Sequence, residues 1–295
     1  MKKMRISNAV ARLAIAALFL LALPQAARAH GELLIRIAAL TRQIEAATNN
    51  PAPLYLQRGE LHREHKDWKV AASDYDRAAQ LDPNLVAVDF CRATMLADSG
   101  ELDAGRAMFD KVIARCSTDG QAFIGRARVL ATLGQLKAAV ADFQNGISLL
   151  REPNPNFFLE LAHVQVADGQ TNQALGSLDQ GLIKLGPVLP LQVYALELDL
   201  QLKNHESALA RLDAMIERAP RKENWLARRG DILLAAGRKT EARKSYEAAL
   251  AAADTLPLRL QQAPHLVKLR SRVNAALAAI TSAPPIAKTD EKFSK

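Results

Sequence analysis

A short pattern of residue sizes recurs six times in this chain at a nearly constant interval. The first two positions of the pattern lie twelve positions apart and are almost always Gly or Ala: Gly59 and Ala71, Ala93 and Gly105, Ala127 and Ala139, Ala162 and Ala174, Leu196 and Ala208, Gly230 and Ala242. A bulky residue follows four positions later, and a generally small one three positions after that: Tyr75 and Ala78, Phe109 and Val112, Phe143 and Gly146, Leu178 and Gly181, Leu212 and Met215, Tyr246 and Ala249. Two antiparallel helices can approach to the short end of their usual separation of about 8 to 10 Å only where small residues face each other and a bulky side chain fills the remaining gap. The recurrence therefore predicts a series of helical hairpins.

Glycine and proline mark the turns that such hairpins need. Glycines lie between the first two positions of four copies, at Gly100, Gly134, Gly169 and Gly237, where a glycine can end one helix and turn the chain. Prolines lie near the ends of the second helices, at Pro83, Pro153, Pro187, Pro220 and Pro257, where they prevent the helix from continuing. Because no alternating strand pattern of useful length appears, the sequence predicts an all-α chain.

The period of about 34 residues and its pattern resemble the tetratricopeptide repeat (TPR) family. The resemblance covers residues 51–256, and its best copy runs from Leu54 to Pro83, with Tyr55 and Trp68 also at the positions typical of the family. Four residues depart from the pattern: Arg58 replaces an aliphatic residue, Leu196 a small residue, and Lys66 and Lys203 the turn glycine. The resemblance implies an all-α fold, a right-handed α-solenoid of about six TPR hairpins.

The segments that flank this array are expected to close it. Residues 30–50 carry apolar residues at helical spacing, including Ile37 and Ile44, and are interpreted as an N-terminal helix that forms a partial repeat. Residues 257–282 are interpreted as a C-terminal capping helix whose outer face carries Lys268, Arg270 and Arg272. Residues 283–295 are expected to form a disordered tail.

Residues 1–29 have the composition of a secretory signal peptide. Lys2, Lys3 and Arg5 precede an apolar run over residues 9–23, and Ala27-Arg28-Ala29 supplies the small-x-small motif that precedes cleavage. The sequence therefore predicts cleavage after Ala29 and a periplasmic or secreted mature protein without a stable membrane anchor. The alternative is a retained anchor, which the short apolar run disfavours.

Removal of this segment changes the charge balance. It contains five of the 39 Lys and Arg residues and no acidic residue, which leaves 34 basic against 31 acidic side chains. Because neither a basic stripe nor stacking aromatics are visible, nucleic acid is not expected as a partner.

The residue types give no sign of catalysis or of a cofactor. The chain has no phosphate-binding loop, nucleophile elbow, zinc-binding His-Glu-x-x-His or dinucleotide fingerprint, so an enzyme is not predicted and no metal site is assigned. The two cysteines, Cys91 and Cys116, fall on the two helices of one predicted hairpin and could form a disulfide; the alternative is two separate buried thiols.

The inner surface of the predicted array is the candidate binding site. In stacked hairpins the first helices line this groove, and its exposed stripe is offset by one from the small packing residue. The candidate peptide-binding residues are Leu56, Glu60, Arg63, Phe90, Thr94, Ile124, Arg128, Leu159, His163, Val193, Glu197 and Asp231. Phe90 is the expected apolar anchor, and Arg128 the expected partner of a carboxylate or main-chain group.

The sequence thus predicts a non-enzymatic scaffold or assembly factor of the bacterial envelope that binds peptide segments of another protein. One alternative is copper handling through the amine and imidazole of a mature N-terminal His30. A second alternative is a noncatalytic subunit of an envelope enzyme complex.

Overall fold

The computed structural model describes residues 31–282, which divide into two compact units, one ending at Pro153 and one beginning at Asn154. The predicted signal peptide, His30 and the predicted tail lie outside the described residues. Within residues 31–282 every regular element is a helix, so the predicted all-α fold of repeated hairpins is confirmed. No helix in this range is long and apolar enough to cross a bilayer.

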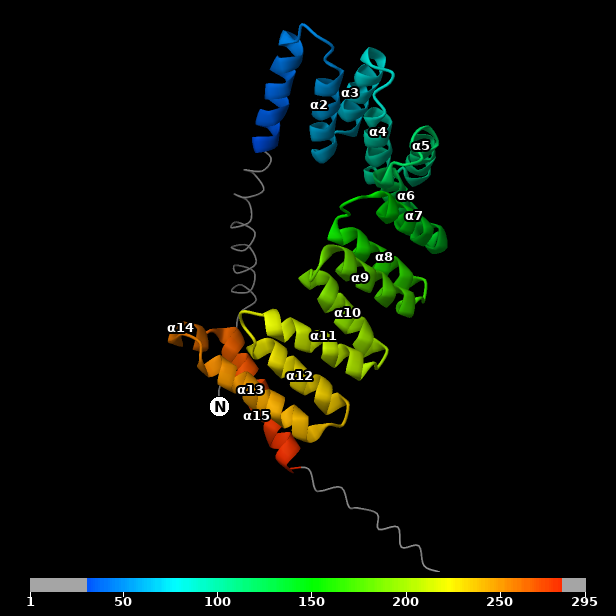
Figure 1. Ribbon diagram of the computed structural model, residues 1–295. Coiled ribbons are helices and arrows are strands. Elements are labelled where there is room, and N and C mark those ends of the chain that lie inside the picture. Colours follow the sequence, from blue (N-terminus) through cyan, green and yellow to red (C-terminus); the bar gives the residue numbers. More distant parts are fainter. Residues whose placement is uncertain (1–30, 283–295) are drawn as a thin grey trace, which may run out of the picture. The chain divides into compact units, whose positions relative to one another are not determined.

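The first unit contains a helix over residues 31–46 followed by three helical hairpins. The hairpins are α2 (Ala52–Glu64) with α3 (Trp68–Leu81), α4 (Ala87–Asp98) with α5 (Leu102–Arg115), and α6 (Gly120–Thr132) with α7 (Leu136–Leu149). Figure 1 shows the two helices of each pair lying side by side, and α3 contacts α4 as α5 contacts α6.

The second unit contains three further hairpins and a pair of terminal helices. The hairpins are α8 (Pro155–Ala167) with α9 (Thr171–Leu185), α10 (Leu189–Gln201) with α11 (His205–Arg218), and α12 (Glu223–Ala235) with α13 (Lys239–Asp254). The short α14 (Leu258–Gln261) then leads into α15 (Pro264–Ser282), which packs on α13 and α12.

The helices of a hairpin approach closely because a side chain is missing where a ring must fit. A β-carbon added to Gly59 would lie 2.6 Å from Cε1 of Tyr75, and one added to Gly230 would lie 2.5 Å from Cε1 of Tyr246. Both tyrosines are almost completely buried. The predicted pairing of small and bulky positions is therefore how these two hairpins pack.

Consecutive hairpins are also joined by arginines that follow the repeat. Arg126 of α6 donates from Nε to Asp142 of its own second helix, at 2.6 Å, and from Nη1 to Asp110 of the preceding hairpin, at 2.7 Å. Arg58 likewise binds Asp74 of its own hairpin, and Arg92 binds Asp76 of the preceding hairpin. Arg58, which replaces the usual aliphatic residue, thus binds a carboxylate that the fold has buried.

The helix over residues 31–46 contacts α2 through a hydrogen bond. Thr41 Oγ1 accepts a hydrogen bond of 3.1 Å from Nη1 of Arg58, the nitrogen that Arg126 uses toward its preceding hairpin. Leu34 and Ile35 remain exposed on this helix. The interpretation of the segment as a partial repeat stays a prediction.

The arginines of the C-terminal helix make ion pairs with the preceding hairpin. Arg270 binds Asp254 of α13 at 2.7 Å, and Arg272 binds Asp231 of α12 at 2.6 Å. Lys268 and Arg272 stay exposed, whereas Arg270 is half-buried beside α13.

The lysines at the turns take the backbone conformation of the glycines they replace. Lys66 has φ 65° and Lys203 has φ 59°, beside values of 75° to 90° at the four turn glycines. A side chain in this left-handed region strains the backbone.

We expect Lys66→Gly and Lys203→Gly each to raise the free energy of unfolding by about 0.5 to 1 kcal/mol, measured by urea denaturation. Lys111→Gly, inside α5, is the control and should lower it by about 1 kcal/mol; a fall at all three positions would contradict the interpretation.

The two carboxylates bound by Arg126 should differ in their contribution to stability. The Asp142 side chain is 7% exposed and that of Asp110 is 51% exposed. Loss of a buried partner leaves a charge without compensation, whereas a solvated pair contributes little. We expect Asp142→Asn to lower the free energy of unfolding by about 2 kcal/mol and Asp110→Asn by less than about 1 kcal/mol, measured by chemical denaturation. Equal losses would show that burial does not set the effect.

Candidate functional site

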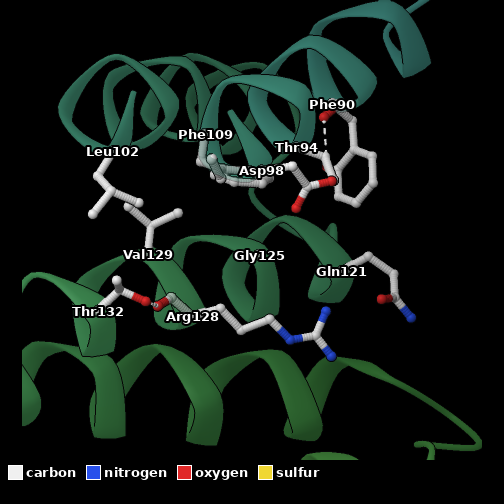
Figure 2. A pocket seen from close by; sticks show the side chains of 11 residues that line it. Phe90, Thr94, Asp98, Leu102, Phe109, Gln121, Gly125, Arg128, Val129 and Thr132 are labelled. Carbon is white, nitrogen blue, oxygen red and sulfur yellow. Dashed lines mark hydrogen bonds between the residues drawn. The ribbon is translucent and has the colours of Figure 1, made fainter. Parts of the chain in front are cut away.

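The first unit has a cleft of about 360 Å³ between the first helices of its second and third hairpins, α4 and α6. Its lining is mostly apolar, with polar groups at the rim (Figure 2): Phe90, Thr94, Ala97, Asp98, Leu102, Phe109, Gln121, Gly125, Arg128, Val129 and Thr132. Three of the predicted groove residues, Phe90, Thr94 and Arg128, are thus brought together. The size falls at the lower end of ligand pockets, which span about 300 to 1,000 Å³.

The cleft has an aromatic floor because one residue of α6 has no side chain. A β-carbon added to Gly125 would lie 2.5 Å from two ring atoms of Phe109, so only glycine lets that ring stand where it does. The other five copies have a side chain at this position, namely Gln57, Cys91, Glu160, Tyr194 and Arg228. Gly125 was not among the predicted site residues, although a single glycine among these larger residues is a visible signal in the sequence.

Phe90 forms one wall of the cleft. Its ring packs edge-on against that of Phe109, with centroids 5.7 Å apart and an angle of 74° between the planes. Phe90 also lines a second depression together with Val86, Ala87, Cys116, Asp119 and Gln121. It therefore contributes to two mostly apolar hollows.

Charged groups border the cleft on both helices. Asp98 at the end of α4 accepts from Arg63 of α2, which also binds Glu60 in its own helix at 3.0 Å. On the other side Arg128 is exposed, and Figure 2 shows it extending along α6 toward the end of the cleft that Gln121 borders. The negative charge at the rim is thus held by Arg63, and Arg128 supplies the positive charge.

Two further predicted residues of the first unit have roles inside the hairpins. Glu60 accepts a hydrogen bond from the buried Tyr75 hydroxyl as well as from Arg63, and burial together with this carboxylate raises the pKa of Tyr75. Leu56 packs against the core of the first hairpin. Both side chains therefore help to hold the inner surface in place.

The prediction that Ile124 lines the groove is wrong. Its side chain is completely buried, and a β-carbon added to Gly146 of α7 would lie 2.8 Å from Ile124 Cδ1. The glycine in α7 leaves room for Ile124, so this side chain turns into the hairpin.

The predicted groove residues of the second unit lie in different surroundings. His163 is exposed on α8 and stacks on Tyr194 of α10, with ring centroids 4.4 Å apart. Burial, and then the nearby carboxylate of Glu197, raise the pKa of Tyr194. Leu159 and Val193 are half-buried on the same two helices. His163, Tyr194 and Glu197 give the unit an aromatic and acidic surface.

Asp231 is occupied by partners within the second unit. It accepts from the Tyr246 hydroxyl at 2.8 Å and from Arg272 of α15 at 2.6 Å. The Tyr246 contact matches the one between Tyr75 and Glu60 in the first hairpin, so the acidic residue belongs to the packing of the repeat. Asp231 is therefore held by the fold on two sides.

The disulfide considered between Cys91 and Cys116 does not form in the structure, where both thiols are free. Cys91 packs with the core of the first hairpin, whereas Cys116 ends α5 with its Sγ 3.7 Å from Thr118 Oγ1. Burial, and then the charge of Glu60, raise the pKa of Cys91 to about 12. At neutral pH this thiol is protonated and poorly nucleophilic.

Comparisons with known proteins agree with this architecture. Residues 188–269 match the family model of a tetratricopeptide repeat-like domain. The structure is similar to the C-terminal part of a TPR repeat-containing protein from Cytophaga hutchinsonii, at 14% identity over 81% of this chain and 95% of the other, with a TM-score of 0.57. It is also similar to a chain in the structure of Naa15/Naa10 bound to HypK-THB, at 14% identity over 77% of this chain and 35% of that one, with a TM-score of 0.55. No curated protein matches the sequence.

The resemblance to tetratricopeptide repeat proteins is thereby confirmed. Residues 188–269 match the model of a tetratricopeptide repeat-like domain, and the described residues have the hairpin fold of TPR proteins. The similarity to solved structures shows the fold alone, because function in repeat proteins depends on the residues of each surface.

Proposed function

We propose that this chain is a non-enzymatic protein-interaction scaffold or assembly factor of the bacterial envelope, and that it binds a peptide segment at the cleft between α4 and α6. The observation that carries the proposal is the aromatic floor that Gly125 opens beneath Phe90 and Arg128. A concave, mostly apolar surface with a few fixed polar groups is what peptide and small-ligand sites share.

The chemistry of the cleft defines the peptide that fits it. Phe90, Phe109 and Val129 offer apolar contacts for one bulky aliphatic or aromatic side chain. Arg128 is exposed on the rim opposite Asp98, and its guanidinium can bind a carboxylate of the ligand next to that apolar residue. The ligand is therefore an apolar residue beside an acidic one, within a segment of a partner protein.

The hydroxyl groups of the cleft are arranged for structure. Thr94 donates to the Phe90 carbonyl at 3.0 Å, and Thr132 donates to the Arg128 carbonyl at 2.9 Å, both within their own helices. Neither hydroxyl is paired with a general base, which nucleophilic catalysis by threonine needs. Among residues 31–282, no group of three or more His, Cys, Asp or Glu side chains is placed to hold a metal ion. These features support a binding role.

Location in the envelope rests on the N-terminal sequence. The basic residues 2, 3 and 5, the apolar run over 9–23 and the Ala27-Arg28-Ala29 motif are those of an exported precursor. We expect the chain expressed in a bacterial host to be recovered from the periplasm or the medium with His30 as its first residue, measured by intact mass. A mass that still includes residues 1–29, found in the membrane fraction, would contradict export with cleavage.

Selection of peptides on the full chain tests the cleft. We expect peptides chosen from a random display library to carry an apolar residue next to an acidic one. Their affinity should fall at least about tenfold with Gly125→Leu, which fills the cleft, and with Phe90→Ala and Arg128→Ala, measured by fluorescence anisotropy.

Matched variants separate loss of binding from loss of the fold. Gly176→Leu adds the same side chain to α9, where an added β-carbon meets nothing within 4 Å, and should leave binding unchanged. Because Gly125→Leu must displace Phe109, Phe90→Ala provides an independent readout at an already half-exposed side chain. Selected peptides that bind all three cleft variants as they bind the unmodified chain would refute the proposal.

A further inference from the structure

The last helix, α15, holds the place of the first helix of a seventh hairpin. Arg270 binds Asp254 of the preceding hairpin, as Arg126 binds Asp110. The next residue, Ser271, is small, and although it lies 41 residues after Gly230 we assign it the position of Gly59 and Gly230. Leu266 and Val273 are fully buried in the same core cluster as residues of α13. The family match also extends into this helix, as far as Leu269. α15 therefore has the features of the first helix of a hairpin.

The side of α15 that a second helix would cover is open. In α12 the corresponding residues Gly230 and Leu233 are buried beneath α13. In α15 their equivalents Ser271 and Asn274 are exposed, and Val267, one turn before Ser271, is 53% exposed. Among the described residues no helix lies on this face, so α15 presents a first-helix surface without its partner.

The ion pair of Arg270 is also half of the arrangement seen inside the array. Arg126 gives Nη1 to the preceding hairpin and both Nε and Nη2 to Asp142 of its own second helix. Arg270 gives Nη1 to Asp254, and within residues 31–282 no acceptor binds its Nε or Nη2. No described residue therefore binds at Arg270 the nitrogens that hold the second helix at Arg126.

Residues 264–282 include Lys268, Arg270 and Arg272 and no acidic residue. Arg270 and Arg272 already pair with Asp254 and Asp231 of the preceding hairpin. The carboxylate that would complement this helix is therefore one placed beside Nε and Nη2 of Arg270, as Asp142 is placed beside Arg126.

We propose that α15 is a docking surface for an amphipathic helix of a partner protein, which completes a seventh hairpin. The helix is defined by the second helices of this chain: a small residue, an aspartate three positions later, a bulky residue directly after it, and a small residue three positions further on. α3 has this pattern in Ala71, Asp74, Tyr75 and Ala78, and α7 has it in Ala139, Asp142, Phe143 and Gly146. This surface lies in the second unit and does not depend on the peptide cleft of the first.

A second copy of the chain fits this surface less well. Among the described residues the helix over residues 31–46 has no first-helix partner, but its residues at the four defining positions are Ile37, Leu40, Thr41 and Ile44. They offer no carboxylate for Arg270 and no bulky residue above Ser271. The observations therefore favour a foreign helix that carries the aspartate.

The test adds the missing helix to the full chain. A copy of residues 68–81, the α3 sequence, is joined after Lys295, so that it is present at high effective concentration. We expect amide hydrogen exchange in α15 to slow by about tenfold and the thermal midpoint to rise. The matched control carries the same extension with the changes that correspond to Asp74→Asn and Tyr75→Ala, and should leave α15 exchange as in the unextended chain.

A variant of α15 itself completes the experiment. Ser271→Phe places a large side chain on an exposed position, so it should leave the unextended chain folded while abolishing the effect of the added helix. Unchanged exchange in α15, or equal slowing by the control extension, would overturn the proposal. Self-association of the unextended chain that Ser271→Phe abolishes would assign the surface to a second copy and would equally overturn the partner helix.

Discussion

The close contact between a helix backbone and an aromatic ring is the constraint on which the hairpins depend. Tyr75 lies on Gly59 and Tyr246 lies on Gly230 so tightly that any β-carbon at either glycine would overlap the ring. Dense packing of this kind fixes the separation of the two helices and leaves little room for alternative registers. It also brings the tyrosine hydroxyls to Glu60 and Asp231, which sets the side chains of the inner surface.

Arginine and aspartate side chains then fix how one hairpin follows another. Arg126 spans two consecutive hairpins through Asp110 and Asp142, and Arg58 joins the first hairpin to the helix before it. In the second unit Arg211 of α11 joins two hairpins from a different position in the repeat, because it binds Asp179 of α9 and the fully buried Asp199 of α10. A carboxylate in the core of thin, alanine-rich helices is tolerated only because a charged partner accompanies it.

The candidate sites arise where the repeat is broken. Gly125 replaces larger residues and opens the cleft, and α15 ends the described array with a first helix that has no second. Phe90, Thr94 and Arg128 could be predicted as surface residues because the offset from the small packing residue is a property of helix geometry. Ile124 could not, since the glycine that makes room for it lies on the other helix of its hairpin. The ion pair of Arg272 likewise depended on Asp231, which belongs to the preceding hairpin.

The sequence by itself determined the helical hairpins, their register and their turns, because these follow from residue size and spacing that recur with every hairpin. It also placed Lys66 and Lys203 at the turns in the position of the glycine, where both have a positive φ. Only the tertiary structure decided which groove residues face solvent, that the two cysteines stay apart, and where a cleft opens. Those outcomes depend on contacts between helices that are distant in the sequence, where the presence or absence of a single side chain decides the space available to its neighbour.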